Sequence, residues 1–207
     1  IYSGESGTNF FTYYLKKYPL KAILFGLTYL KEVLLYLVKI TDLKRLKERF
    51  FIFLESHSNE EIEKIVDGFW KEYGKKMYSW TQKELEENKK EADMVIVTSA
   101  TPLFLLERLI PEMGYDMVFG TEFQGDGKEK FIAEIKGENN KGMEKVRKLN
   151  KWAKENDIEY EIIKFYSDSL ADKPLYDIAD KKYWIKKGKK LEGMPGKKTL
   201  LDIFFWD

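Results

Sequence analysis

The first part of the chain has apolar residues that repeat at helical spacing. Between residues 7 and 90 they recur every three or four positions, as at Ile62, Ile65 and Phe69. This period places them on one side of a helix, so the segment is predicted to be nearly all helical. Its most apolar part, residues 20–40, is predicted to form a pair of helices.

From Asp93 onward the pattern changes to short β-rich runs separated by amphipathic stretches. This alternation predicts βαβ units, and therefore an α/β fold with a doubly wound, mainly parallel sheet in a Rossmann-like core. The predicted strands are residues 94–98, 117–119, 131–133, 160–166 and 183–185. The predicted helices between them are residues 102–110, 142–156 and 174–179. We predict a core formed by residues 1–6 and 91–207, with an all-helical cap inserted at residues 7–90.

The apolar run at residues 20–40 is interrupted too often to span a membrane. Lys21, Lys31, Glu32 and Lys39 break it and leave at most nine uncharged residues in a row. A spanning helix needs roughly 20. Apolar residues still cover almost every side of the predicted helix, which is more than one packing face requires. We expect the surplus to pack against another helix of the cap; the alternative is peripheral contact with a membrane or a lipid tail.

Composition excludes several classes of site. The 36 basic and 35 acidic residues give a formal net charge of +1, so no overall field attracts nucleic acid. The absence of cysteine excludes disulfides, thiolate catalysis and zinc–thiolate sites. One histidine, His57, argues against a Ser-His-Asp triad, and its polar neighbours predict an exposed side chain. These features fit a cytoplasmic protein, with membrane association through the apolar segment as the alternative.

Two acidic residues come after a predicted strand late in the chain. Asp168 comes soon after the run at residues 160–166, and Asp172 lies four residues later. Open α/β sheets bind ligands beyond the C-terminal ends of their strands. Carboxylates at this spacing can place one oxygen on a hard cation and another behind it as support. The alternative is an ordinary helix cap.

Further polar groups lie at predicted loop positions. Ser99 and Ala100 come after the strand at residues 94–98 and precede a predicted helix, where a hydroxyl and backbone N–H groups can bind an anion. Lys141 precedes another helix and could balance a dianionic substrate. Glu5, in a Gly-rich turn, could reach a site between core and cap. Taken singly, each also has an ordinary structural interpretation.

The order of these features resembles the haloacid dehalogenase superfamily, in the phosphoserine-phosphatase-like branch with a helical cap. Ser99 in VIVTSATP matches the second motif of the family, and Lys141 in NNKGMEKVRKL matches the third. Asp168 and Asp172 in YSDSLADKPL match the fourth motif. Glu5 matches the glutamate that reaches the substrate in phosphoserine-specific relatives. The resemblance covers essentially the whole chain.

The family's first motif, Asp-x-Asp-x-Thr, does not occur in these 207 residues. In relatives it closes the first strand and supplies the nucleophile and the acid/base. The opening IYSGESG resembles the segment directly after that motif in relatives. Loss of this central strand would expose the edges of its neighbours and open the core. We therefore expect the parent protein to carry the motif just upstream of Ile1.

The resemblance implies a magnesium-dependent phosphomonoester hydrolase that works through an aspartyl-phosphate. Its substrate would be a small phosphorylated metabolite such as phosphoserine. Asp168 would bind Mg²⁺, with Asp172 orienting it or a metal-bound water. Ser99, with the backbone of Ala100, would bind a phosphate oxygen. Lys141 would pair with the phosphoryl group and the nucleophile.

Two other functions remain open at this point. Residues 13–38 resemble the cap of bacterial phosphatidylglycerophosphate phosphatases, which implies a lipid phosphatase at a membrane surface. A non-catalytic binding module that has lost its nucleophile is the other. Retention of the four motif residues in order argues against that module.

Overall fold

The first half of the chain is helical, as predicted. The fold is described from a computed structural model, which describes residues 2–108, 112–125 and 130–194. Residues 20–40 do not form a helix pair: α2 is one helix that runs through Gly26 to Leu37, because a single glycine is tolerated within a helix. The α-helices of this part are α1 (Ser6–Lys17), α2 (Pro19–Leu37), α3 (Leu43–Phe50), α4 (Asn59–Tyr73) and α5 (Thr81–Glu91), with 3₁₀ turns at Ile52–Ser56 and Gly74–Lys76.

The second half combines helices with strands, and two of the four strand pairs described are parallel, which confirms the predicted α/β class. β1 (Ile96–Pro102) runs parallel to β2 (Met117–Thr121). β5 (Ile162–Ser167) runs parallel to β6 (Ala179–Lys186), and β7 (Lys189–Glu192) pairs antiparallel to β6. The helices of this unit are α6 (Leu103–Leu106), α8 (Met143–Glu155) and α9 (Lys173–Ile178). α6 is shorter than the helix predicted at residues 102–110: it ends at Leu106, residues 107 and 108 form a turn, and residues 109 and 110 lie outside the described residues.

The strand predicted at residues 131–133 belongs to a different arrangement from the parallel strands. β3 (Phe123–Gln124) and β4 (Ile132–Ile135) form an antiparallel pair. The backbone N–H groups of Ala133 and Ile135 donate to Glu55 and Glu48 at 2.8 and 2.9 Å. Carboxylates of the helical segment therefore satisfy the free edge of β4 and join it to α3.

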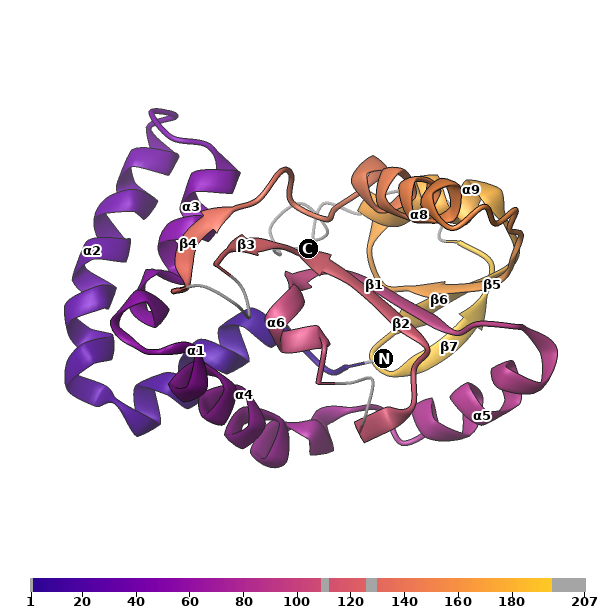
Figure 1. Cartoon of the computed structure of the whole chain (residues 1–207), viewed down its shortest axis with the longest axis horizontal. Helices are drawn as coiled ribbons and strands as arrows, with labels where there is room; N and C mark the ends of the chain where they lie inside the picture. The colour runs from indigo at the N-terminus through magenta and orange to yellow at the C-terminus, as the bar shows by residue number, and fades with distance from the viewer. Residues whose placement is uncertain (1, 109–111, 126–129, 195–207) are drawn as a thin grey trace.

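The strands β1, β2, β5, β6 and β7 form a layer between helices, and β3 and β4 lie apart from it beside α3 (Figure 1). α8 and α9 cover one face of the layer and α5 lies on the other. Ion pairs and hydrogen bonds attach α5: Tyr166 donates to Glu84 at 2.6 Å, and Lys164 lies 2.8 Å from Glu91. This layering puts the C-terminal ends of the parallel strands beside the start of α8.

One hydrophobic core runs through both halves of the chain. Phe10 of α1 packs edge-to-face on Phe69 of α4 and on Phe104 of α6. The indole N–H of Trp70 donates to the Leu105 carbonyl at 2.7 Å. Because aromatic packing and a buried hydrogen bond cross between the halves, the helical segment is held firmly beside the strands.

His57 is buried, so the prediction of an exposed histidine was wrong. Its ring is 3% exposed, with Nε2 2.9 Å from the Tyr14 hydroxyl and Nδ1 3.5 Å from Glu61. The neighbouring sequence is polar because Ser58 caps α4, and the ring turns inward from the turn before it. Burial lowers the pKa of His57 below its usual value, with Lys21 adding to the effect and Glu61 opposing it.

We expect His57 to make the protein less stable in mild acid. The lowered folded pKa means that the unfolded chain takes up the proton first as the pH falls below about 6.5. The free energy of unfolding, measured by urea denaturation, should therefore decrease between about pH 7 and pH 5.5. The His57→Gln variant should lose less stability over this interval, and an identical loss in both proteins would contradict the assignment.

Candidate active site

The C-terminal end of β1 carries a cluster of hydroxyl groups. Ser99 Oγ donates to Thr101 Oγ1 at 3.0 Å and accepts from the Thr101 backbone N–H at 3.1 Å. The Ser6 hydroxyl lies 2.7 Å from Thr101 Oγ1. Ser99 lies within β1 rather than after it, and Pro102 caps α6 instead of starting it. The cluster brings the turn that contains Glu5 to the end of β1.

Asn140 fixes the next loop against two strands. Its side chain is fully buried, and Nδ2 donates to the carbonyls of Ser99 and Phe119, both at 2.9 Å. Its backbone N–H donates to Thr121 Oγ1 at 3.1 Å. These bonds hold the loop with Lys141 at the C-terminal ends of β1 and β2.

The same loop also lies against the acidic turn after β5. Gly142 has φ 61° and ψ −127°, a backbone conformation that residues other than glycine rarely adopt. A Cβ atom there would lie 3.4 Å from the Ala171 carbonyl oxygen. The glycine therefore permits the turn into α8, at a place where the two loops lie in contact.

Asp172 is a buried structural carboxylate. It is 5% exposed, with Oδ1 2.6 Å from Lys145 Nζ and Oδ2 accepting from Ser167 Oγ at 2.6 Å. Both carboxylate oxygens already have strong partners, so Asp172 does not fit a direct metal ligand. It fits the supporting role, because it ties the turn after β5 to α8.

Asp168 is exposed and lies just beyond the end of β5. Within the described part of the chain, its carboxylate accepts no hydrogen bond and makes no ion pair. Burial, with the nearby Asp172 and Asp168 carboxylates, raises the pKa of Tyr176, whose hydroxyl donates to the Ser167 carbonyl at 2.7 Å. Because the Asp168 carboxylate has no hydrogen-bond or ion-pair partner among the described residues, it is available for a cation. The described residues contain no group of three or more acidic or histidine side chains placed to hold a metal, but Mg²⁺ keeps several waters and needs only one or two carboxylates.

Lys47 of α3 is a site residue that the sequence analysis missed. Its ammonium group donates to the Ala100 carbonyl, to Asn139 Oδ1 at 2.7 Å and to Thr121 Oγ1 at 3.2 Å. These acceptors lie at the ends of β1 and β2 and in the loop before α8. In the sequence, Lys47 is one of several basic residues on an amphipathic helix, and no motif distinguishes it.

The electrostatics of Lys47 show which other charges are near it. Burial lowers the pKa of Lys47 to about 7, and the Lys141 charge acts in the same direction. The Glu5 carboxylate opposes the shift. Lys47, Lys141 and Glu5 thus share one environment, in which burial and the second lysine disfavour the charged form of Lys47.

A cavity of about 510 Å³ separates the two parallel strand pairs. Among the described strands, nothing pairs with the β1 edge that β2 leaves open or with the β5 edge that β6 leaves open. Residues of both edges line the cavity, including Ile96, Val97 and Thr98 from β1 and Ile162 and Lys164 from β5. Side chains of α5 and α8 complete its walls. The cavity thus lies between two open sheet edges, and helices cover it on both sides.

The sequence profile of the haloacid dehalogenase-like hydrolases matches residues 1–177. The chain belongs to this family. Of the positions named from the resemblance, Ser99 lies near the end of β1, in contact with the loop that carries Lys141, and that loop in turn approaches the turn with Asp168 and Asp172. The comparison with curated proteins gave no match.

Solved structures share the fold at low sequence identity. A protein of unknown function from Bordetella pertussis Tohama I has a TM-score of 0.68 and 17% identity, covering 83% of this chain and 78% of its own. A HAD family hydrolase from Salmonella enterica subsp. enterica serovar Typhi has a TM-score of 0.57 and 13% identity, covering 86% and 56%. A phosphoserine phosphatase in its apo form has a TM-score of 0.50 and 20% identity, covering 71% and 70%. At these identities the similarities show a shared fold.

The two aspartates of the site should differ sharply in their contribution to stability. We expect Asp172→Ala to lower the free energy of unfolding by about 3 kcal/mol, because it leaves the buried Lys145 charge unpaired. The double variant Asp172→Ala/Lys145→Met should recover part of this loss. Asp168→Ala, the exposed control, should cost less than about 0.5 kcal/mol in the same urea titrations. Equal losses at both positions would contradict a bracing role for Asp172.

Proposed function

We propose that this protein is a magnesium-dependent phosphomonoester hydrolase that works through an aspartyl-phosphate. One observation supports the proposal: Asn140 joins the end of β1 to the loop with Lys141, and Gly142 of that loop approaches Ala171 in the turn that contains Asp168. Ser99 and Lys141 supply the anion-binding groups, Asp168 is the available carboxylate, and Asn140 and Gly142 hold their loops together. Opposite charges placed this way suit a phosphoryl group better than a neutral substrate.

Each residue has a defined role in this proposal. The Ser99 hydroxyl and the Ala100 N–H bind phosphate oxygens, and Lys141 balances the negative charge that gathers on them. Asp168 holds the cation, and Asp172 keeps the Asp168 turn in place through Lys145. Bound magnesium would neutralise charge on the phosphoryl group, so that an anionic nucleophile is less strongly repelled.

The nucleophile in the proposal is an aspartate on a strand that fills the cavity between β1 and β5. Two open edges and helices on both faces are what a further central strand would need to complete the sheet. The contact of Ser6 with Thr101 puts the first turn of the chain at the C-terminal end of β1. A strand parallel to β1 would end there, so a segment just upstream of Ile1 is the proposed occupant.

The proposed substrate is a small phosphorylated metabolite. Glu5 is exposed and close enough to Lys47 to affect its pKa, so it lies near the proposed phosphate position. A carboxylate there would favour an amino-bearing substrate such as phosphoserine. A phospholipid headgroup is the second candidate, favoured by the exposed apolar side of α2.

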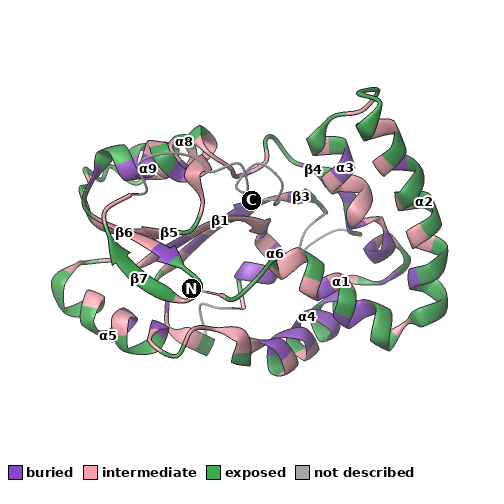
Figure 2. Cartoon of the chain, turned by 180° about the vertical axis from the view of Figure 1, so that it is seen from behind, coloured by how far each residue is buried: buried purple, intermediate pink, exposed green. Residues whose placement is uncertain are grey.

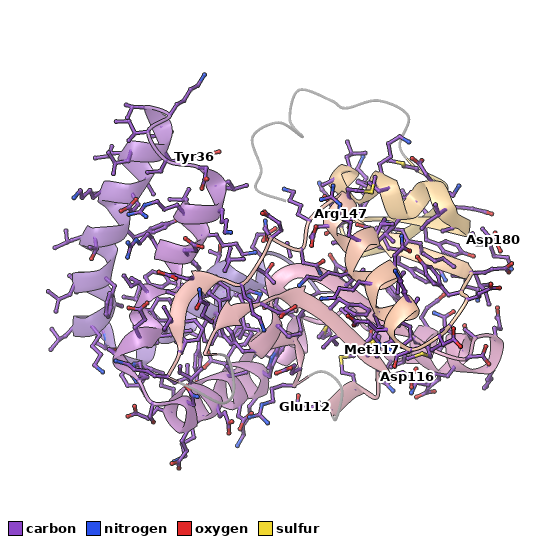
Figure 3. All side chains as sticks on the ribbon, turned by 45° about the horizontal axis from the view of Figure 1, so that its top comes forward. Tyr36, Glu112, Asp116, Met117, Arg147 and Asp180 are labelled. Atoms are coloured by element: carbon purple, nitrogen blue, oxygen red, sulfur yellow. The ribbon has the colours of Figure 1, made fainter. Side chains whose placement is uncertain are left out.

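Hydrolysis of p-nitrophenyl phosphate by the full-length protein tests the proposal. Activity should require Mg²⁺, and Asp168→Asn should lower kcat by at least about a hundredfold, because a ligand of the charge-neutralising ion is lost. Asp180→Asn changes an exposed aspartate on β6 that lies at the far edge of the molecule (Figure 3), so it should keep full activity.

Three outcomes would overturn the proposal. They are full activity of Asp168→Asn, full activity after removal of divalent metals, and no Asp-x-Asp within about ten residues upstream of Ile1, a generous length for a strand. Absence of any phosphatase activity from a protein that does carry the motif would favour a binding module.

Lys47 should give the reaction a pH dependence near neutrality. A dianionic substrate is bound best by charged Lys47, so kcat/KM should fall as the pH rises through about 7. Lys47→Arg keeps its charge and should flatten this fall. Lys47→Met should lower kcat/KM by about tenfold to a hundredfold, because it removes a positive charge and the hydrogen bonds that Lys47 makes to the strand ends and the loop before α8. An unchanged pH profile in Lys47→Arg would remove Lys47 from substrate binding.

A further inference from the structure

The outward side of α2 is an apolar surface with no partner in the described chain. Leu20, Leu24 and Leu27 are 79%, 68% and 66% exposed. The prediction that this surplus packs on another cap helix was wrong. Figure 2 shows α2 as largely exposed, and in Figure 3 its side chains extend away from the rest of the molecule. The other strongly exposed residues of this segment are Ile23, Leu30, Leu34, Leu37, Val38 and Ile40.

The inward side of α2 is fully engaged with the protein. Ala22 is buried, and the Tyr29 ring packs edge-to-face on Phe50 at 5.3 Å. Glu32, the only acid of the helix, is 9% exposed and lies 3.6 Å from Arg45 and 4.0 Å from Arg49 of α3. The helix is therefore fixed with its leucines outward.

The exposed charges along α2 have one sign. Lys21 and Lys31 lie on the helix and Lys39 comes just after it, and all three are exposed. Lys31 falls between Leu27 and Leu34 on the same helical face, because the three positions are separated by four and three residues. Glu32 is turned away from this surface. We call the outward apolar residues of α2, with these lysines, the α2 face.

We propose that the α2 face binds the surface of an anionic lipid membrane. Leucines would enter the boundary between headgroups and acyl chains, while long lysine side chains keep their charges at the phosphates. No helix among the described residues is long and apolar enough to cross a membrane, so α2 would lie along the surface. A second copy of the chain fits less well, because the face offers no exposed carboxylate on α2 to pair with the lysines of its partner.

Vesicle co-sedimentation of the full-length protein tests this proposal. The protein should pellet with vesicles of phosphatidylcholine and phosphatidylglycerol in equal parts, less so at high salt, and poorly with phosphatidylcholine alone. Leu24→Gln/Leu27→Gln should weaken binding at least about tenfold. Lys31→Gln should weaken it about fivefold. The matched control Ile178→Gln/Leu191→Gln changes two exposed apolar residues of α9 and β7 and should bind like the wild type.

Soluble readouts separate this proposal from the catalytic one. The Leu24/Leu27 variant should keep its thermal unfolding temperature and its hydrolysis of p-nitrophenyl phosphate, because the changed side chains are exposed and lie outside the site. Failure to pellet with anionic vesicles would overturn membrane binding. So would equal binding to neutral vesicles, or a dimer in solution that the leucine variant dissociates. None of these results would alter the assignment of the site.

Discussion

Asn140 donates from one buried amide to the carbonyls of Ser99 and Phe119, and so joins two parallel strands to the loop that carries Lys141. Carbonyl groups at strand ends lose their water when a loop covers them, and they need a donor in exchange. A side-chain amide meets that need and also fixes the loop's position. The proposed phosphate-binding groups depend on this arrangement, because Ser99 and Lys141 are far apart in sequence.

Two lysines connect this loop region to other parts of the molecule. Lys145 pairs with Asp172 and brings the turn after β5 to the start of α8. Lys47 reaches from the helical segment to acceptors beside Asn140. The proposed site therefore depends on contacts from the core and from the helical segment. A movement of α3 would shift Lys47 relative to the proposed phosphate position. Burial of Lys47, with a second lysine nearby, lowers its pKa.

The cavity between β1 and β5 and the α2 face illustrate different ways in which apolar surface stays uncovered. At the cavity, backbone edges are open together with side chains, and an added strand would satisfy both. At the α2 face the backbone bonds are satisfied within the helix, and only side chains are exposed. Such a surface suits a partner that offers no hydrogen-bonding pattern, as the interior of a lipid layer does.

The sequence by itself determined the class of fold and led to residues of the proposed site. Helical periodicity marked the first half, and alternating strands and helices predicted parallel strands, because both patterns are local consequences of backbone geometry. Motif spacing led to Ser99, Lys141, Asp168 and Asp172. Only the tertiary structure decided the pairing of Asp172 with Lys145, the entry of Lys47 into the site, the burial of His57 and the outward turn of the α2 leucines. Each of these depends on what another part of the chain places beside the residue, and a one-dimensional pattern does not contain that information.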